Sequence, residues 1–226
     1  MASFSSMRGL FITLEGIDGC GKSTQHTLLV ESLRKRGLDP LATREPGGTG
    51  VGEDIRSMLS TYSTSLAPST ELLLIVAARA QHVEEVIRPA LAAGRIVISD
   101  RYTDSTVVFQ GYGRGLDLVL IDEMNRFATG GLRPDLTILF DLETGVARRR
   151  LDVRDSDSRS DSPDTEMSYF DREETAFHER VREGYLKIAA AEPERFKIVD
   201  ASGAIEGSHE QVMSIVMSAL KVKSAI

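Results

Sequence analysis

The sequence contains the stretch Gly16-Ile17-Asp18-Gly19-Cys20-Gly21-Lys22-Ser23, which fits the pattern G-x-x-x-x-G-K-S/T. In that pattern backbone N–H groups wrap around phosphates, the lysine reaches the terminal phosphates, and the hydroxyl reaches a magnesium ion. The stretch follows residues 10–14, which are β-rich, and opens residues 23–36, which carry leucines at helical spacing. A strand, a glycine-rich turn and a helix are the context that such a loop requires. We therefore predict a phosphate-binding loop.

We expect the phosphates of a nucleotide donor and a Mg²⁺ ion to bind on this loop. Lys22 is the expected catalytic cation, Ser23 is an expected metal ligand, and the dipole of the helix that begins there adds to the attraction for phosphate. The predicted donor site comprises Gly16, Asp18, Gly19, Cys20, Gly21, Lys22, Ser23 and Thr24. The alternative is a plain glycine turn with an N-capping serine.

Apolar runs and helical patterns alternate along the rest of the chain. The runs at residues 95–99, 136–140 and 196–199 lack polar alternation, as is typical of strands buried on both faces of a parallel sheet. Helices are predicted at residues 71–93, 124–128, 145–151, 172–191 and 210–220. In the longest, the expected apolar stripe comprises Leu73, Val76, Ala80, Val83, Val86 and Leu91. The alternation predicts an α/β fold with a doubly wound parallel sheet, whose ligands bind outside the carboxyl ends of the strands.

Length and composition exclude several classes of protein. A chain of 226 residues with 41% hydrophobic residues is expected to form a single domain, residues 1–226, rather than a disordered, fibrous or membrane protein. The net charge of −7 gives no basic face for nucleic acid. The single cysteine, Cys20, cannot form an internal disulfide, and residues 1–8 look like a flexible polar leader, so we expect a cytoplasmic protein without a membrane span.

Residues 152–165 interrupt the pattern, because almost all of them are Asp, Ser or Arg. Such a segment cannot bury apolar area, so we expect a mobile surface loop between two helices. A small lid over residues 149–168 is one interpretation of it. A disordered insertion without a role is the other.

Three further motifs distinguish the possible phosphate-binding enzymes. They are residues 44–50 (Arg-Glu-Pro-Gly-Gly-Thr-Gly), residues 77–82 (Ala-Ala-Arg-Ala-Gln-His) and residues 100–111, which begin Asp-Arg-Tyr. The guanine-binding pattern N/T-K-x-D is absent from the sequence. Together with the glycine loop, these motifs resemble the thymidylate kinase family, and the likeness runs from about residue 10 to residue 220. It implies a five-stranded sheet of the P-loop NTPase type, ATP as donor, dTMP as acceptor and Mg²⁺ as cofactor.

The resemblance assigns roles on the acceptor side. Asp18 would hold the sugar 3′-OH or a metal-bound water, Arg44 and Arg101 would hold the acceptor phosphate, and Asp100 would join Ser23 as a metal ligand. Arginine is a planar fork that suits phosphate. The predicted substrate-binding residues are Asp18, Arg44, Glu45, Ile75, Arg79, Arg101, Thr106, Phe109 and Gln110, with Arg79 and either Gln110 or Thr106 reading the thymine edge.

Two positions depart from the family pattern. Ile75 replaces a phenylalanine that commonly stacks on thymine, and Phe109 replaces a tyrosine next to the sugar. The apolar ring of Phe109 should still disfavour a ribose hydroxyl. No general base is required, because the second pKa of a phosphate monoester is about 6 and the acceptor is mostly a dianion at neutral pH. We expect the four histidines to be structural or exposed.

The lid is expected to supply a catalytic arginine. Family members whose loop lacks a basic residue take this charge from the lid, and here the variable positions are filled by Asp18, Gly19 and Cys20. The candidates are Arg149, Arg150, Arg154 and Arg159, of which helical spacing favours Arg150 and Arg154, with Arg159 as the alternative. The resemblance also implies a homodimer formed through helices.

Other interpretations remain. A kinase of the same fold could act on another monophosphate, or on a deoxynucleoside with Glu45 or Glu15 as the base, and a nucleotide-binding module could lack turnover. Each arginine also has a plainer interpretation: Arg79 as a solvated helix residue, Arg101 as a partner of Asp100, and Arg44 as an ion pair with Glu45.

Overall fold

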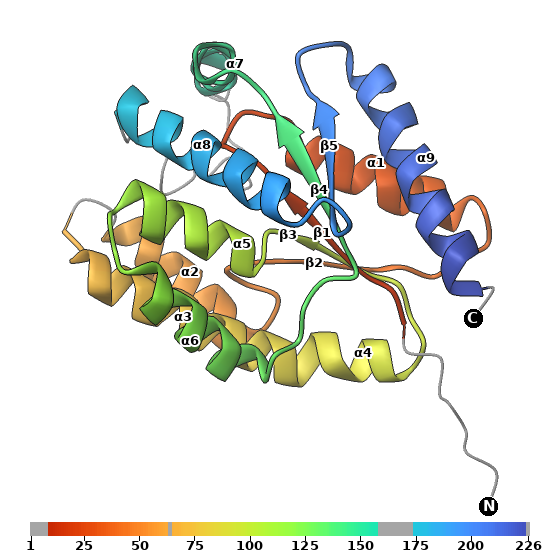
Figure 1. Ribbon diagram of the computed structural model, residues 1–226, viewed down its shortest axis with the longest axis horizontal. Helices are drawn as coiled ribbons and strands as arrows, with labels where there is room; N and C mark the ends of the chain where they lie inside the picture. Colours follow the sequence, from red (N-terminus) through yellow and green to blue (C-terminus); the bar gives the residue numbers. More distant parts are fainter. Residues whose placement is uncertain (1–8, 63–64, 158–173, 225–226) are drawn as a thin grey trace, which may run out of the picture.

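A computed structural model describes residues 9–62, 65–157 and 174–224 (Figure 1). Five parallel strands form a sheet in the order β2-β3-β1-β4-β5. The strands are β1 (Phe11–Glu15), β2 (Leu41–Arg44), β3 (Val97–Asp100), β4 (Leu136–Asp141) and β5 (Phe196–Asp200). The predicted doubly wound α/β fold is confirmed, with β1 at the centre of the sheet.

Helices cover both faces of the sheet. Figure 1 shows α1 and α9 on one side, and α8 together with a long rod formed by α3, η1 and α4 on the other. The helical segments are α1 (Lys22–Arg34), α2 (Gly50–Thr61), α3 (Pro68–His82), the π-helical η1 (Val83–Ile87), α4 (Arg88–Ala92), α5 (Thr103–Thr106), the π-helical η2 (Val107–Gly113), α6 (Leu118–Thr129), α7 (Thr144–Asp157), α8 (Thr175–Ala191) and α9 (Ile205–Ser224). None of the helices described is long and apolar enough to cross a membrane.

The central strand contributes to two of the hydrophobic clusters that the described residues form. Side chains of a strand alternate between its faces, and in β1 Ile12 and Leu14 belong to the core that includes α1 and α9. Phe11 lies in a separate core with η1, α4 and β3, where its ring packs edge-on against Tyr102 with 4.9 Å between centroids. Because both faces are buried, β1 fixes the loop that follows it.

Strand register brings the functional ends together. Leu14 of β1 lies opposite Asp100 of β3, Arg44 of β2 also lies opposite Asp100, and Glu15 lies opposite Leu139 of β4. The carboxyl ends of four strands therefore meet at one edge of the sheet, where ligands bind in doubly wound folds.

Several predicted elements require correction. The rod begins at Pro68 rather than residue 71. Val76, Val83 and Leu91 of the expected stripe are buried, but Leu73 is 58% exposed. The buried face also includes Arg79 and His82, which were not part of the stripe. Hydrogen bonds compensate the buried charge of Arg79. A search for hydrophobic periodicity cannot predict a buried charged residue of this kind. The region expected to be a loop from residue 152 is helical to Asp157, where α7 ends. Residues 158–165 and the leader, residues 1–8, lie outside the described residues.

Candidate active site

The loop between β1 and α1 has a backbone that only glycine accommodates at two of its positions. Gly16 and Gly19 have φ values of 146° and 79°. A Cβ atom would lie 2.6 Å from the carbonyl oxygen of Phe140 at Gly16, and 2.6 Å from that of Ala147 at Gly19. Both distances are far shorter than a van der Waals contact, so the loop packs directly on β4 and α7.

Lys22 folds back over this loop. Its Nζ donates to the carbonyl oxygens of Gly16 and Ile17, each at 2.9 Å, and lies 3.7 Å from Sγ of the buried Cys20. Within the described structure, α1 begins with no side-chain cap and no acidic residue in its first turn. Its first N–H groups can therefore bind an anion, as expected for a phosphate site.

Ser23 and Asp100 form a pair suited to a metal ion. The Ser23 hydroxyl donates to Asp100 Oδ2 at 3.1 Å, across from the end of β3. The second carboxylate oxygen, Asp100 Oδ1, is buried without a hydrogen-bond partner. A buried carboxylate oxygen is costly unless something compensates its charge, and hydroxyl and carboxylate oxygens are ligands that Mg²⁺ prefers. The residues present fit this cation.

Arg101 has a left-handed backbone, with a φ of 71°. Its guanidinium forms an ion pair with Asp18 at 2.6 Å and donates to the Gly16 carbonyl oxygen at 3.2 Å. It also lies over the Phe109 ring, 4.7 Å from the centroid. Arg101 therefore pairs with Asp18 of the loop rather than with its neighbour Asp100.

Burial works to raise the pKa of Asp18, but the charges of Arg101 and Lys22 outweigh it and hold the pKa below its ordinary value. Asp18 is therefore an anion at neutral pH. Its Oδ2 is buried without a hydrogen-bond partner.

Glu15, directly before the loop, is fully buried and accepts three hydrogen bonds. The donors are the backbone N–H of Tyr102 at 2.8 Å, the Ser105 hydroxyl at 2.6 Å and the Tyr185 hydroxyl at 2.7 Å. Burial, assisted by the charge of Asp104, raises the pKa of Glu15 to about 7. These contacts fit an anchor that ties the loop to the segment after β3.

A cleft of about 1130 Å³ joins the loop to the acceptor side. It is lined by Asp18, Gly19, Cys20, Gly21, Lys22, Ser23 and Thr24 of the loop, by Arg44, Glu45, Ile75, Asp100 and Arg101, and by Arg150 of α7. The structure thus places these predicted residues around one cleft at the carboxyl ends of the strands. Its volume lies just above the usual range for ligand pockets, which suits a bisubstrate site.

Arg44 and its neighbour Glu45 have different partners from those considered in the sequence. The half-exposed Arg44 pairs with Glu53 of α2 at 3.0 Å. Glu45 is buried between Arg79, whose Nε donates to it at 2.7 Å, and His82, whose Nδ1 lies 3.0 Å away. Glu45 is therefore held by two side chains of α3, and His82 is structural, as predicted for the histidines.

Arg79 is not a solvated helix residue, because its side chain is only 1% exposed. Besides Glu45, its guanidinium donates to Thr106 Oγ1, Asn125 Oδ1 and the Tyr102 carbonyl oxygen, at 2.7–3.0 Å. Four of its five N–H donors are in these bonds. The other predicted base-reading residues, Thr106 and Gln110, are also buried and do not line the large cleft, and the same holds for Phe109, which was expected next to the sugar.

The structure describes the side chains of two predicted lid arginines, Arg149 and Arg150. Arg150 of α7 donates to the Ala201 carbonyl oxygen at 3.0 Å and lines the cleft, whereas Arg149 is exposed. Arg154 lies on the last turns of α7, where side chains are not described, and Arg159 lies outside the described residues.

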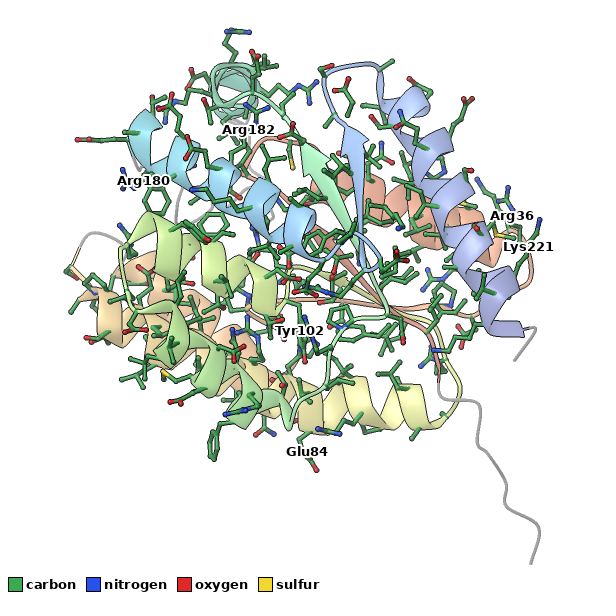
Figure 2. The ribbon with its side chains drawn as sticks, viewed as in Figure 1. Arg36, Glu84, Tyr102, Arg180, Arg182 and Lys221 are labelled. Atoms are coloured by element: carbon green, nitrogen blue, oxygen red, sulfur yellow. The ribbon has the colours of Figure 1, made fainter. Side chains whose placement is uncertain are left out.

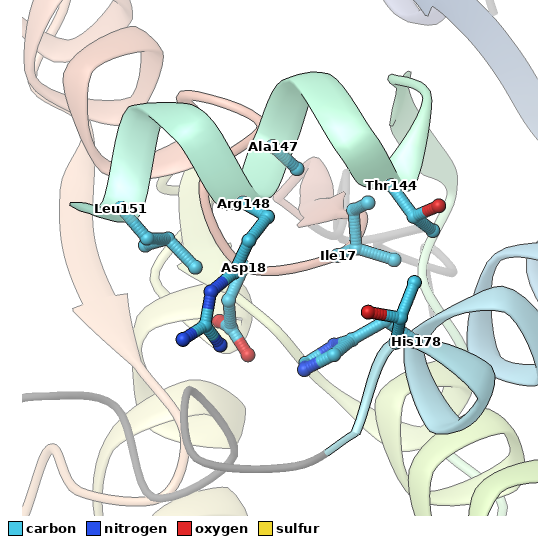
Figure 3. A pocket seen from close by; sticks show the side chains of 8 residues that line it. Ile17, Asp18, Thr144, Ala147, Arg148, Leu151 and His178 are labelled. Carbon is cyan, nitrogen blue, oxygen red and sulfur yellow. The ribbon is translucent and has the colours of Figure 1, made fainter. Parts of the chain in front are cut away.

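A small pocket beside Asp18 holds residues that sequence reasoning did not identify as site residues (Figure 3). Arg148 of α7 and His178 of α8 line it together with Asp18, and Figure 3 shows these three side chains extending toward one another. Tyr185 of α8, described above, was also missed. Arg148 precedes the Asp/Ser-rich segment, whereas His178 and Tyr185 follow it, and no motif in the sequence relates their positions to the loop.

A phosphate-binding loop faces an arginine at the end of the neighbouring strand across one cleft, and this arrangement defines a phosphotransferase of the P-loop kinase class. The chain belongs to the thymidylate kinase family, whose model matches residues 14–212. The predicted activity, ATP-dependent phosphorylation of dTMP, is thereby confirmed at the level of the family.

Similar proteins cover almost the whole chain. The thymidylate kinase of Geobacter sulfurreducens is 46% identical over 211 residues, covering 93% of this chain and 97% of the relative. That of Desulfosudis oleivorans is 50% identical over 195 residues, covering 86% and 90%. The crystal structure of thymidylate kinase from Ehrlichia chaffeensis superposes with a TM-score of 0.72 at 34% identity, covering 93% of this chain and 99% of that one.

Proposed function

We propose that this chain binds ATP on the glycine loop and dTMP on the Arg101 side of the same cleft, and transfers the γ-phosphoryl group to give dTDP and ADP. The observation that carries the proposal is that Lys22, Ser23 and Arg101 converge on one cleft from the ends of adjacent strands. Two anions must be brought into line there, and fixed cations are what such a reaction requires.

Ser23 and Asp100 would hold Mg²⁺, because the unpartnered Asp100 Oδ1 offers a ligand beside the Ser23 hydroxyl. A bound Mg²⁺ supplies charge neutralisation on the transferred phosphates. Lys22, which now rests on loop carbonyl oxygens, would turn to the terminal phosphates of the donor.

Arg101 and Arg44 would bind the acceptor phosphate. Arg101 can exchange the Asp18 carboxylate for phosphate, and Asp18 is then free to accept a hydrogen bond from the sugar 3′-OH or a metal-bound water. Arg44 is half-exposed and pairs with Glu53 at the surface, where such a pair contributes little. It can therefore turn into the cleft at small cost.

The thymine would lie against Ile75, with its edge toward the buried group of Arg79, Thr106, Phe109 and Gln110. Arg79 has one N–H outside its internal bonds. We therefore propose that Arg79 mainly shapes the wall next to the thymine edge. Ile75, which lines the cleft, would make the apolar contact with the base.

The lid would supply the arginine that the loop lacks. Arg150 is the leading candidate, because it lines the cleft whereas its neighbour Arg149 does not. Arg154 and Arg159 remain candidates on sequence grounds. An arginine delivered in this way neutralises charge in the transition state and can matter by about a thousandfold.

We also propose a homodimer in the cytoplasm. Three large apolar side chains are exposed on neighbouring helices: Leu73 of α3 by 58%, and Val119 and Phe127 of α6 by 69% and 88%. Exposed apolar surface of this kind is typical of sites that pack against another protein, here the helices of a second copy. A single buried thiol suits a reducing compartment.

Phosphorylation of a nucleoside hydroxyl is disfavoured by the contacts of the two carboxylates that could serve as its base. Glu45 is held by Arg79 and His82, and Glu15 is sealed among its three donors. Phosphorylation of a phosphate needs no such base.

The test measures initial rates with ATP against dTMP, thymidine, dUMP, dCMP, dGMP and AMP, for the wild type and Arg101→Lys. We expect dTMP to be preferred and thymidine to be inert. Arg101→Lys should raise the KM for dTMP at least tenfold while the KM for ATP changes little, because a bidentate charged contact is lost. A normal KM for dTMP in this variant would refute the assigned acceptor site.

A further inference from the structure

A buried cluster of Glu15, Ser105 and Tyr185 lies behind Arg101. The three residues come from the end of β1, from α5 and from α8, and all are buried. The oxygen atoms of Ser105 and Tyr185 lie 2.9 Å apart, and each lies close to Nη1 of Arg101, at 3.1 Å and 3.3 Å respectively. One guanidinium nitrogen of Arg101 therefore lies within hydrogen-bond distance of two hydroxyl oxygens, and both hydroxyls also contact the Glu15 carboxylate.

The protons of this cluster can be assigned when Glu15 is ionised. Its Oε2 accepts from both hydroxyls, at 2.6 Å from Ser105 and 2.7 Å from Tyr185. Each hydroxyl has one proton, so both protons are committed to the carboxylate. The lone pairs of both oxygens are then left to accept from Arg101. Burial and the nearby Glu15 raise the pKa of Tyr185 well above its ordinary value, so its hydroxyl keeps the proton.

This arrangement matters most when Arg101 leaves Asp18. The ion pair with Asp18 is broken if the guanidinium turns to a phosphate, whereas the hydroxyl pair, the Gly16 carbonyl oxygen and the Phe109 ring stay on the protein side of Arg101. The fixed acceptors would hold the rest of the side chain while its outer edge changes partner.

We infer that Tyr185 is a positioning residue for the acceptor phosphate: through its hydroxyl, shared between Glu15 and Arg101, it aims the Arg101 guanidinium into the cleft. This inference rests on the proposed role of Arg101. Tyr185 belongs to the helix that follows the predicted lid, so the same hydroxyl ties that helix to the end of the central strand. The Tyr185 ring also packs edge-on against Phe109, with 6.4 Å between centroids.

Glu15 makes the cluster sensitive to pH. The charged groups that face it are Asp104 and Arg101, and Asp104 is itself paired with Arg195 at 2.6 Å. The hydroxyls of Ser105 and Tyr185 stabilise the ionised carboxylate. Removing the Tyr185 hydroxyl withdraws one of these donors, so Glu15 would ionise at higher pH. The acidic limb of acceptor use should move with it.

The experiment compares Tyr185→Phe with the wild type and with Tyr112→Phe, which removes a hydroxyl from a half-buried ring on η2 outside the cluster. In Tyr185→Phe we expect kcat/KM for dTMP to fall about tenfold or more, the KM for ATP to change less than twofold, and the acidic limb to shift to higher pH. The dTMP phosphate titrates identically for all enzymes, so a shift of the limb reports the protein. Tyr112→Phe should match the wild type.

An equal loss with both substrates, or an unmoved acidic limb, would overturn the inference, because a merely structural hydroxyl does not choose between substrates. If Tyr185→Phe does not fold, Ser105→Ala removes the second hydroxyl of the pair and must give the same selective loss and the same shift. Arg101→Lys, measured alongside, separates the two proposals: a normal KM for dTMP there refutes the acceptor site, whereas an altered one with unaffected Tyr185→Phe refutes the positioning role alone.

Discussion

The Asp18 carboxylate and the Arg101 guanidinium are 2.6 Å apart, with side chains exposed by only 10% and 15%. The pair joins the loop after β1 to the turn after β3. Because Arg101 is already neutralised by an anion of the protein, an incoming phosphate must compete with Asp18 for it.

Replacing Asp18 by asparagine should remove this competition. We expect inorganic phosphate to inhibit Asp18→Asn at about tenfold lower concentration than the wild type, since a charged hydrogen bond contributes about 1.5–3 kcal/mol. Turnover should fall, because Asp18 is also the proposed partner of the sugar. Asp54→Asn, an equal charge change on the exposed face of α2, is the control. Unchanged inhibition by phosphate would show that the pair does not guard the site.

Lys22→Ala should fold and lose turnover by about a hundredfold or more, because a charge on the transferring phosphate is lost where electrostatic stabilisation dominates. A coupled assay of ADP release measures it. Lys35→Ala, at the exposed end of α1, should leave the rate unchanged. Near-normal activity of pure Lys22→Ala would contradict the assignment of a phosphate-binding loop.

The preference for dTMP over dUMP should be modest. The two differ by one methyl group, which an apolar pocket discriminates by about 1–3 kcal/mol. Ile75→Phe should preserve or tighten dTMP binding by offering a ring for stacking. Ile75 packs with Ile55 and Leu59, so the variant should also lose a few degrees of Tm through overpacking. A severe loss of affinity in a folded variant would show that Ile75 does not face the base.

Alanine substitution of Arg150 should lower kcat by two or more orders of magnitude at saturating ATP and dTMP, with little change in the binding of either substrate. Arg149→Ala is the matched control, because this neighbour on α7 is exposed. The same measurement on Arg154→Ala and Arg159→Ala completes the set. A catalytic lid is excluded by near-normal turnover in all four variants.

Glu15 should make stability depend on pH. Its pKa is raised from 4.5 to about 7 in the folded protein, so the folded state binds the proton more tightly than the unfolded chain. The resulting contribution is complete below pH 4.5 and is lost as the pH rises through 7, by roughly 3 kcal/mol in total. Relative to the wild type, Glu15→Gln should therefore become more stable between pH 5 and pH 8. Urea unfolding across this range measures it, with the exposed Glu31→Gln as control.

The sequence was sufficient to predict the loop and the sheet because both depend on local rules. Glycines at Gly16 and Gly19 and the apolar run of β1 are visible in any short window. The surroundings of Arg79 were not predictable in the same way. Its partners Glu45, Thr106 and Asn125 lie 34, 27 and 46 residues away, and periodicity cannot register a buried charge that distant groups satisfy.

Local signals also failed where two propensities compete. Residues 152–157 are polar enough for a loop, but the Arg148–Asp152 pair at helical spacing, 3.1 Å apart, supports continuation of α7. The helix α2 was not among the predicted helices, although Thr49 caps it by accepting from Gly52 N at 3.0 Å.

The burial of Cys20 beneath Lys22 has a practical consequence for fluorescence measurements. Burial raises the pKa of this thiol above its ordinary value despite the nearby charges of Lys22 and Arg101, and its side chain is inaccessible, so it reacts slowly with maleimide dyes. It is the only cysteine in the sequence. Surface cysteines placed on α7 and α9 can therefore be labelled for distance measurements across the cleft without first removing the natural thiol from the nucleotide loop.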